Sequence, residues 1–215
     1  WIVSLTALSI VKTGYCVFCD NHATQLPLVY RLQNPNLFPG DPFLAAMEGY
    51  MGWVWWLVAR LSETIDLELL LGSLFLLTRL LLIYAAGRLG AVLVPGSKLA
   101  PFFSALLMAL GPYPILGDGT LVEMYWEQSS MFMPLFVLAL VLLLEGNPVR
   151  FCALFGVAYL INPLYGTWAA LFLGVTFLVD PNRGEWKRLA MASPLAIVLA
   201  APVFLGGVGV LSQPD

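Results

Sequence analysis

The stretch Leu67–Gly87, LELLLGSLFLLTRLLLIYAAG, decides the fold class of this chain. An α-helix needs about 20 mainly apolar residues to cross the hydrocarbon core of a bilayer, and this stretch is long enough. It carries Glu68 at its mouth and Arg79 inside it. A charge within a span costs a few kcal/mol unless it pairs or snorkels. We therefore expect a transmembrane helix here. Arg79 could pair with a carboxylate, hold a lipid phosphate or snorkel in part, and these alternatives stay open. Lys12 in the first apolar run is a similar candidate.

The composition of the whole chain agrees with this expectation. Hydrophobic residues make up 60% of the 215 positions, charged residues 11%, and the mean hydropathy is +0.86. An ordinary soluble domain contains about 25% charged residues, which supply its polar shell. Because lipid solvates apolar helix surfaces directly, the composition predicts an integral membrane protein.

Further apolar runs place helices along most of the chain. The runs cover residues 1–18, 99–117, 129–145, 151–162, 165–179 and 189–207. Asn162 and Pro163 break the helix between 151–162 and 165–179, so we expect a short broken hairpin there. The fold class predicted is all-α, a polytopic transmembrane helical bundle of about seven spans, with residues 1–215 as a single transmembrane domain. Because the chain starts at Trp1 rather than Met, we expect it to be part of a longer protein.

Residues 19–66 are predicted to form the first extracytoplasmic loop. Asp20 or Asn21 can cap a helix that runs to about Leu32. The aromatic segment 43–62 suits the headgroup layer, where an indole ring places an apolar body and a polar N–H. We favour an interfacial helix over 43–62, and a true span stays open as the alternative.

The basic residues predict the orientation in the membrane. Loops 88–98, 146–150 and 180–188 hold six of the ten Lys and Arg residues. By the positive-inside rule these loops are cytoplasmic, which places 19–66 and 118–128 on the outer side. The net charge of −3 and the absence of a basic stretch exclude nucleic acid as a partner.

The cysteines are Cys16, Cys19 and Cys152. The C-x-x-C spacing of the first two lacks the following His of a haem attachment site. A zinc site would need four ligands, which are not evident. We expect unlinked, small apolar residues near the membrane boundary, and a local disulfide or a metal site stays open.

The first outer loop carries the strongest catalytic candidate. Asp20, His22, Gln25 and Arg31 follow the first apolar run closely. A carboxylate at the lipid–water boundary can act as a general base toward a hydroxyl, and reduced hydration would raise its pKa toward working pH. The alternative is that Asp20 only caps the helix, with His22 and Gln25 as solvated side chains.

The second outer loop, GDGTLVEMYWEQSS (117–130), gathers acids and aromatic residues. Glu123 and Glu127 would share one face of a helix and repel unless a cation or a hydroxylated ligand lies between them. A divalent cation is therefore an open cofactor assignment, and a merely solvated face is the alternative. Trp126 and Tyr125 suit the C–H face of a sugar ring.

Three segments carry a resemblance to a known family. They are DNHATQLPLVYRLQNPNLFPGDPF (20–43), EMYWEQSSMFMPLFVLALVLLLEG (123–146) and GVAYLINPLYGTWAALFLG (156–174). With the layout of spans and loops, they resemble bacterial members of the GT-C superfamily of polytopic glycosyltransferases. The family's usual pair of acids separated by one residue is absent, since Asp20 is followed by Asn21 and His22.

The resemblance implies an activity and a location. A GT-C-like enzyme transfers a sugar from a polyprenyl-phosphate donor at the extracytoplasmic face, here of the bacterial inner (plasma) membrane. Its partners would be membrane lipid and the lipid-linked sugar. Asp20 would be catalytic, and the substrate-binding residues would be His22, Gln25, Arg31, Glu123, Trp126 and Glu127.

A second function class stays open. The single His and the missing acidic pair also fit a non-catalytic structural or accessory subunit of a larger membrane protein complex, whose aromatic helix and acidic loops bind other membrane subunits. A transporter is disfavoured because charges within the spans are too few to trace an ion route.

Overall fold

The computed structural model describes residues 1–50, 53–111, 114–115, 119–120, 123–179 and 183–211. These residues are mostly helical, as predicted. The helices are α1 (Ile2–Thr13), α2 (His22–Gln33), α3 (Pro42–Tyr50), α4 (Trp53–Leu61), α5 (Leu67–Leu93), α6 (Ala100–Leu110), α7 (Gln128–Leu144), α8 (Pro148–Ile161), α9 (Pro163–Val179) and α10 (Arg183–Leu211). Two short strands, β1 (Pro114–Ile115) and β2 (Gly119–Thr120), pair antiparallel between α6 and α7.

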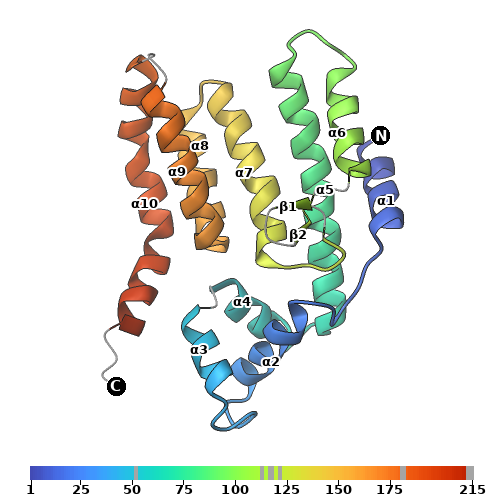
Figure 1. Ribbon diagram of the computed structural model, residues 1–215, viewed down its shortest axis with the longest axis vertical. Coiled ribbons are helices and arrows are strands. Elements are labelled where there is room, and N and C mark those ends of the chain that lie inside the picture. The colour runs from blue at the N-terminus through green and yellow to red at the C-terminus, as the bar shows by residue number, and fades with distance from the viewer. Residues whose placement is uncertain (51–52, 112–113, 116–118, 121–122, 180–182, 212–215) are drawn as a thin grey trace.

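The helices form two groups (Figure 1). Helices α1 and α5 to α10 run roughly along one direction, and α2, α3 and α4 lie together at one end of them. Each of the seven predicted apolar runs coincides with one helix of the first group. The predicted loop 19–66 contains the second group. The sequence therefore located these helices correctly.

Helix α5 is the longest apolar element. Its first turn is capped by Asp66, whose side chain accepts a hydrogen bond from the Leu69 amide at 3.0 Å. Among the described helices, α5 alone is long and apolar enough to cross a membrane, and α1, α6, α7, α8 and α9 are shorter apolar helices. A buried helix in a soluble protein can share the length and composition of α5. The seven-span arrangement is therefore taken up under the proposed function.

The predicted break between the fifth and sixth runs is confirmed. Helix α8 ends at Ile161, and Pro163 begins α9. At the first position of a helix the backbone N–H has no intrahelical partner, so a proline there costs no hydrogen bond. The Asn162 side chain accepts a hydrogen bond from the Tyr165 amide at 3.1 Å and so satisfies one free N–H of the first turn. Two local rules, a proline at the helix start and an Asx cap, account for this hairpin.

Glycine permits close contact between α8 and α10. A Cβ added at Gly156 would lie 2.9 Å from Leu199 Cβ, 3.0 Å from Ala196 Cα and 3.1 Å from the Ala196 carbonyl oxygen. Two of these three atoms belong to the backbone of α10 and cannot rotate away. The α8–α10 contact therefore depends on the missing side chain.

We expect Gly156→Ala to lower the free energy of unfolding by about 1–3 kcal/mol, because the methyl group overpacks the helix contact. Gly174→Ala in α9 is the matched control, since nothing lies within 4 Å of its added Cβ. That change should be neutral or stabilise the helix by about 0.5–1 kcal/mol. Denaturant unfolding of both variants in detergent checks the pair, and equal effects would contradict this packing.

Segment 43–62 differs in part from its prediction. Instead of one helix it contains α3 and α4, with nine residues each. Trp53 and Trp56 are exposed, as an interfacial helix requires, but Trp55 is fully buried against Trp126 at a ring-centroid distance of 5.4 Å. Trp55 is therefore a core residue of the α2–α4 group, and the interfacial position of the segment stays a prediction.

The basic residue of the first apolar run has a local explanation. Lys12 is exposed at the end of α1, and its ammonium group donates to the carbonyl of Leu110 in the last turn of α6. A cation at a helix C-terminus satisfies a free carbonyl and favours the helix dipole. Lys12 thus joins α1 to α6.

Candidate functional site

The start of α2 meets the segment before α7, so the two predicted halves of the site are adjacent. The His22 imidazole hydrogen-bonds the Trp126 carbonyl at 2.6 Å, and the Asn21 amide donates to the Glu127 carboxylate at 2.9 Å. The Cys16 amide also donates to the Met124 carbonyl at 2.8 Å. These contacts join residues about 100 positions apart in the sequence.

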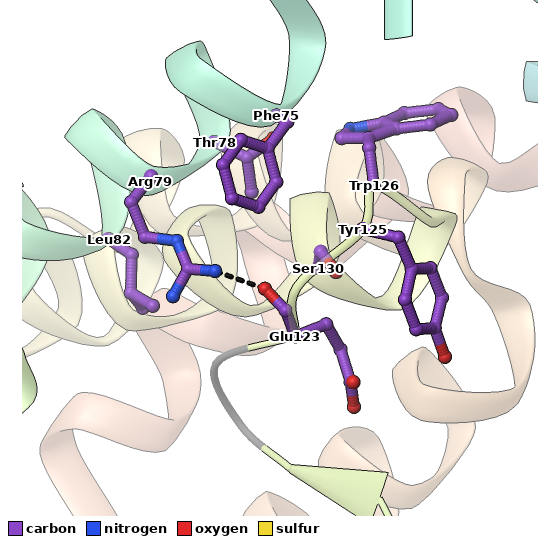
Figure 2. A pocket seen from close by; sticks show the side chains of 8 residues that line it. All are labelled: Phe75, Thr78, Arg79, Leu82, Glu123, Tyr125, Trp126 and Ser130. Atoms are coloured by element: carbon purple, nitrogen blue, oxygen red, sulfur yellow. Dashed lines mark hydrogen bonds between the residues drawn. The ribbon is translucent and has the colours of Figure 1, made fainter. Parts of the chain in front are cut away.

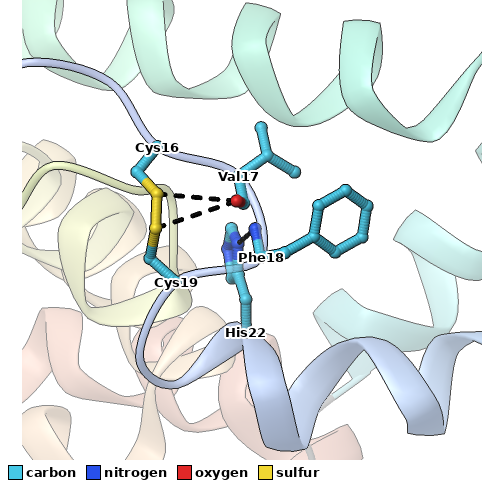
Figure 3. Close-up of a disulfide and its surroundings, with 5 residues drawn as sticks. All are labelled: Cys16, Val17, Phe18, Cys19 and His22. Atoms are coloured by element: carbon cyan, nitrogen blue, oxygen red, sulfur yellow. Dashed lines mark hydrogen bonds between the residues drawn. A yellow bond between two sulfur atoms is a disulfide. The ribbon is translucent and has the colours of Figure 1, made fainter.

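A disulfide shapes the turn that leads into α2 (Figure 3). Cys16 and Cys19 are bonded, so the expectation that they are unlinked is wrong, and the alternative of a local disulfide is correct. Both sulfurs lie against the Val17 carbonyl oxygen, at 3.5 and 3.7 Å, but without a proton neither can donate to it. Phe18 and Asp20 have φ of 65° and 50°, in the left-handed region. Such a tight turn at non-glycine residues needs support from its surroundings.

His22 is the central residue of this junction. It is 1% exposed, its Nδ1 accepts a hydrogen bond from the Phe18 amide at 3.2 Å, and therefore its Nε2 carries the proton donated to Trp126. Burial lowers the pKa of His22, and the hydrogen bond to the Trp126 carbonyl opposes this effect. Both ring nitrogens are used within the chain. His22 is thus a neutral structural link, neither solvated nor directed at a substrate.

Asp20 lies at the surface of the junction. The residue is exposed, and its carboxylate lies near Tyr125, where its charge helps to raise the pKa of the Tyr125 hydroxyl. Asp20 does not cap α2, because Asn21 holds the N-cap position and uses its side chain for Glu127 instead. The predicted reduced hydration of Asp20 is not found, but a carboxylate beside Tyr125 and accessible from outside is present.

Among the acids of the described residues, Glu127 has a clearly shifted pKa. Burial raises its pKa, and the charges of Glu123 and Asp20 act in the same direction, whereas hydrogen bonds from Asn21 and Gln25 lower it. Glu127 and Glu123 were expected on one helical face, but α7 begins only at Gln128 and the preceding residues are not helical. The two acids nevertheless interact electrostatically, so the predicted repulsion holds without the helix.

The aromatic residues of this segment are buried. Tyr125 is 4% and Trp126 is 2% exposed, so neither ring presents an open face on which a sugar could stack. The ring of Tyr125 instead contacts the His22 ring edge-on at a centroid distance of 5.2 Å. Burial raises the pKa of the Tyr125 hydroxyl, as do the nearby carboxylates. The Tyr125 hydroxyl therefore stays protonated and can donate to Asp20.

Gln25 completes the junction on the α2 side. The residue is 9% exposed, and its amide lies near the Glu127 carboxylate, where it acts to lower the pKa of Glu127. Its Oε1 atom is buried without a hydrogen-bond partner among the described residues. Gln25 is therefore placed with the acids, as predicted for a binding residue.

Arg79 lies behind this junction, beside a small cavity (Figure 2). Arg79 is 4% exposed, its guanidinium lies 4.9 Å from the centre of the Phe75 ring, and it donates to the Glu123 carbonyl and, at 3.4 Å, to the Ser9 hydroxyl. The cavity of about 10 Å³ can hold a single water molecule. Its lining consists of Phe75, Thr78, Arg79, Leu82, Glu123, Tyr125, Trp126 and Ser130.

Arg31 is not part of the junction. It lies near the far end of α2, where its guanidinium donates to the Asp41 carbonyl at 3.5 Å. Asp118 of the second loop lies outside the described residues. Within the described ranges, no group of three or more His, Cys, Asp or Glu side chains is placed to hold a metal ion.

Two members of the junction were missed from the sequence as functional contacts. From the sequence we interpreted Asn21 as a helix cap, which is its position but not the role of its side chain. We interpreted Tyr125 as a stacking ring, whereas the structure places it near the Asp20 carboxylate. Both roles depend on the contact between α2 and the segment before α7. No local pattern in either segment encodes that contact.

Comparison of the chain with protein-family models, with curated proteins and with solved structures finds no match.

Proposed function

We propose that this protein is a polytopic membrane protein in which α1 and α5 to α10 are the spans. Large, exposed apolar side chains on α9 and α10 support this arrangement. Their contact with water would cost free energy, whereas lipid solvates them directly. They include Trp168 at 65%, Phe172 at 71%, Ile197 at 62% and Val198 at 68% exposed. The short helices would match the membrane by tilt, by local thinning of the bilayer or by neighbouring subunits.

We place α2, α3 and α4 on the extracytoplasmic side. The Cys16–Cys19 disulfide supports this side, because disulfides persist in oxidising compartments and are rare in the cytosol. The connections from α5 to α6 and from α7 to α8 lie at the opposite end of the bundle (Figure 1). Lys98 lies on the first connection, Arg88 near the end of α5 and Arg150 near the start of α8. Both signals support this orientation, and we propose the bacterial inner membrane as its location.

The activity we propose is transfer of a sugar from a polyprenyl-phosphate donor to an acceptor hydroxyl at this outer face. The observation that carries the proposal is the convergence of the exposed Asp20, the buried Tyr125 and the half-buried Glu127 at one end of the bundle. Asp20 accepts the acceptor's proton as general base, and Tyr125 orients the carboxylate. Glu127, with its raised pKa, binds a hydroxyl of the substrate, and Gln25 positions Glu127.

An accessory subunit of a larger membrane complex is the rival function. The full use of His22 within the chain and the burial of Tyr125 and Trp126 favour it, because they leave few free groups for a substrate. In that case the exposed apolar side chains of α9 and α10 would face other subunits instead of lipid. The two functions differ in what purifies with the protein and in whether a donor is consumed.

Reconstitution into proteoliposomes tests the proposal. A radiolabelled polyprenyl-phosphate sugar is added with a mixture of acceptor lipids and glycans, and loss of label from the donor is measured for outward-facing and inward-facing preparations. The proposal expects donor consumption that depends on the protein and on access to the α2–α4 side. No consumption, together with a stoichiometric partner after mild purification, favours the accessory subunit.

A further inference from the structure

The cavity beside Arg79 is lined by several side-chain hydrogen-bond donors, and two of the polar atoms of its lining residues have no partner among the described residues. Trp126 Nε1 and Ser130 Oγ are buried and have no hydrogen-bond partner among the described residues. Both residues line the cavity with Arg79 (Figure 2). An indole N–H is a donor only, a guanidinium has five N–H donors and no acceptor, and a serine hydroxyl can also donate. The cavity thus presents donors from three side chains.

The charge of Arg79 distinguishes this cavity from an ordinary water site. The Arg79 guanidinium donates hydrogen bonds to the Glu123 carbonyl and the Ser9 hydroxyl, which are both neutral. The Glu123 carboxylate interacts with Arg79 electrostatically but points away from the guanidinium (Figure 2). A buried cation is costly unless a negative charge compensates it. The geometry therefore favours an anion over water in the cavity.

We propose that this cavity binds one small monovalent anion of the size of chloride. Arg79 supplies the charge, Trp126 Nε1 and Ser130 Oγ each donate a hydrogen bond, and Phe75 and Leu82 form the apolar wall. A cavity that holds one water molecule also suits a single halide but excludes a phosphate or a carboxylate. The site does not depend on the proposed sugar transfer. Since it lies between α5 and the segment before α7, occupation would stabilise the wall behind the carboxylate junction.

Bromide, chloride and gluconate at constant ionic strength test the proposal on the full purified chain. We expect the melting temperature of the wild type to rise with bromide or chloride over gluconate, and bromide-soaked crystals to show an anomalous peak between Arg79 and Ser130. Ser130→Ala and Trp126→Phe should each raise the halide concentration of half-maximal effect by about tenfold or more, because each removes a hydrogen bond to the anion. Glu123→Gln should lower that concentration, because it removes a repelling charge.

The controls separate this site from general salt effects. Arg60→Ala changes an exposed arginine that pairs with Glu63, and it should leave the halide response unchanged. If Trp126→Phe does not fold, Ser130→Ala alone still decides, because it removes only one oxygen. A melting temperature that does not respond to halide, or a cavity that holds water in bromide-soaked crystals, would overturn the proposal. Neither outcome bears on donor turnover, which is measured separately.

Discussion

Asp20→Asn should lower the rate of sugar transfer by about 10²–10⁴-fold while the protein remains folded and inserted. The amide keeps the size of the side chain, but it cannot accept a proton from an acceptor hydroxyl. General base catalysis by a positioned carboxylate typically contributes a factor of this size. The measurement is donor turnover in proteoliposomes, with melting temperature as the check on folding.

Asp41→Asn is the matched control for the loss of one acid in the same loop. The Asp41 carboxylate accepts hydrogen bonds from the Phe43 and Leu44 amides at 2.9 and 3.1 Å, and an Asn side chain can replace it in that cap. Turnover should therefore be preserved. If Asp20→Asn retains wild-type turnover and Glu127→Gln abolishes it, Glu127 is the base and the role given to Asp20 is wrong.

His22→Ala should lower the free energy of unfolding by about 2–4 kcal/mol. The substitution leaves the Trp126 carbonyl and the Phe18 amide without their partner, and each unsatisfied buried group costs about 1–3 kcal/mol. Thr24→Ala is the control on the same helix, because the Thr24 hydroxyl donates locally to the Asn21 carbonyl one turn earlier. Its effect on the free energy of unfolding should stay within about 0.5 kcal/mol. Denaturant unfolding in detergent compares the two.

The same residue predicts a pH dependence. The folded state lowers the pKa of His22 below its ordinary value of 6.5, so the unfolded chain binds the proton first as the pH falls. The contribution of His22 to stability is complete above about pH 6.5 and is lost as the pH falls through the folded pKa, with a slope of at most about 1.4 kcal/mol per pH unit. His22→Gln cannot titrate and should lack this slope. An identical slope in both proteins between pH 5 and 7 would contradict a buried, neutral His22.

The sequence predicted the helices because their signals are local. Apolar length located α5 and the six other helices of the bundle, and Asn162 with Pro163 located the break between α8 and α9. These signals are hydrophobic periodicity, helix-capping residues and proline, and each depends on residues within one or two helical turns of each other. For the same reason they say nothing about which helices are neighbours.

The contents of the junction were predicted better than its geometry. Six site residues named from the sequence are gathered at the start of α2 and in the segment before α7. They are Asp20, His22, Gln25, Glu123, Trp126 and Glu127. Their burial was not predicted, because it results from packing between distant segments. In the structure His22 is a buried residue that links two segments, and Trp126 is a core residue. Arg31 was expected nearby because it shares a helix with His22, but it lies near the far end of that helix.

The disulfide shows the same limit at shorter range. The spacing of Cys16 and Cys19 permits a bond, but the turn that brings the two sulfurs together has left-handed backbone at Phe18 and Asp20. Non-glycine residues seldom adopt that conformation, and the local sequence gives no signal for it. Contacts with Met124 and His22, both outside the turn, support it in the folded chain.

Photocrosslinking with a polyprenyl-phosphate sugar that carries a diazirine on the sugar tests the central claim most directly. The claim is that the junction of Asp20, Tyr125 and Glu127 faces a lipid-borne substrate at the outer surface. Mass spectrometry should find crosslinks on residues 15–25 and 123–130, and excess unlabelled donor should remove them. Crosslinks confined to the exposed faces of α9 and α10 and insensitive to unlabelled donor would contradict the claim.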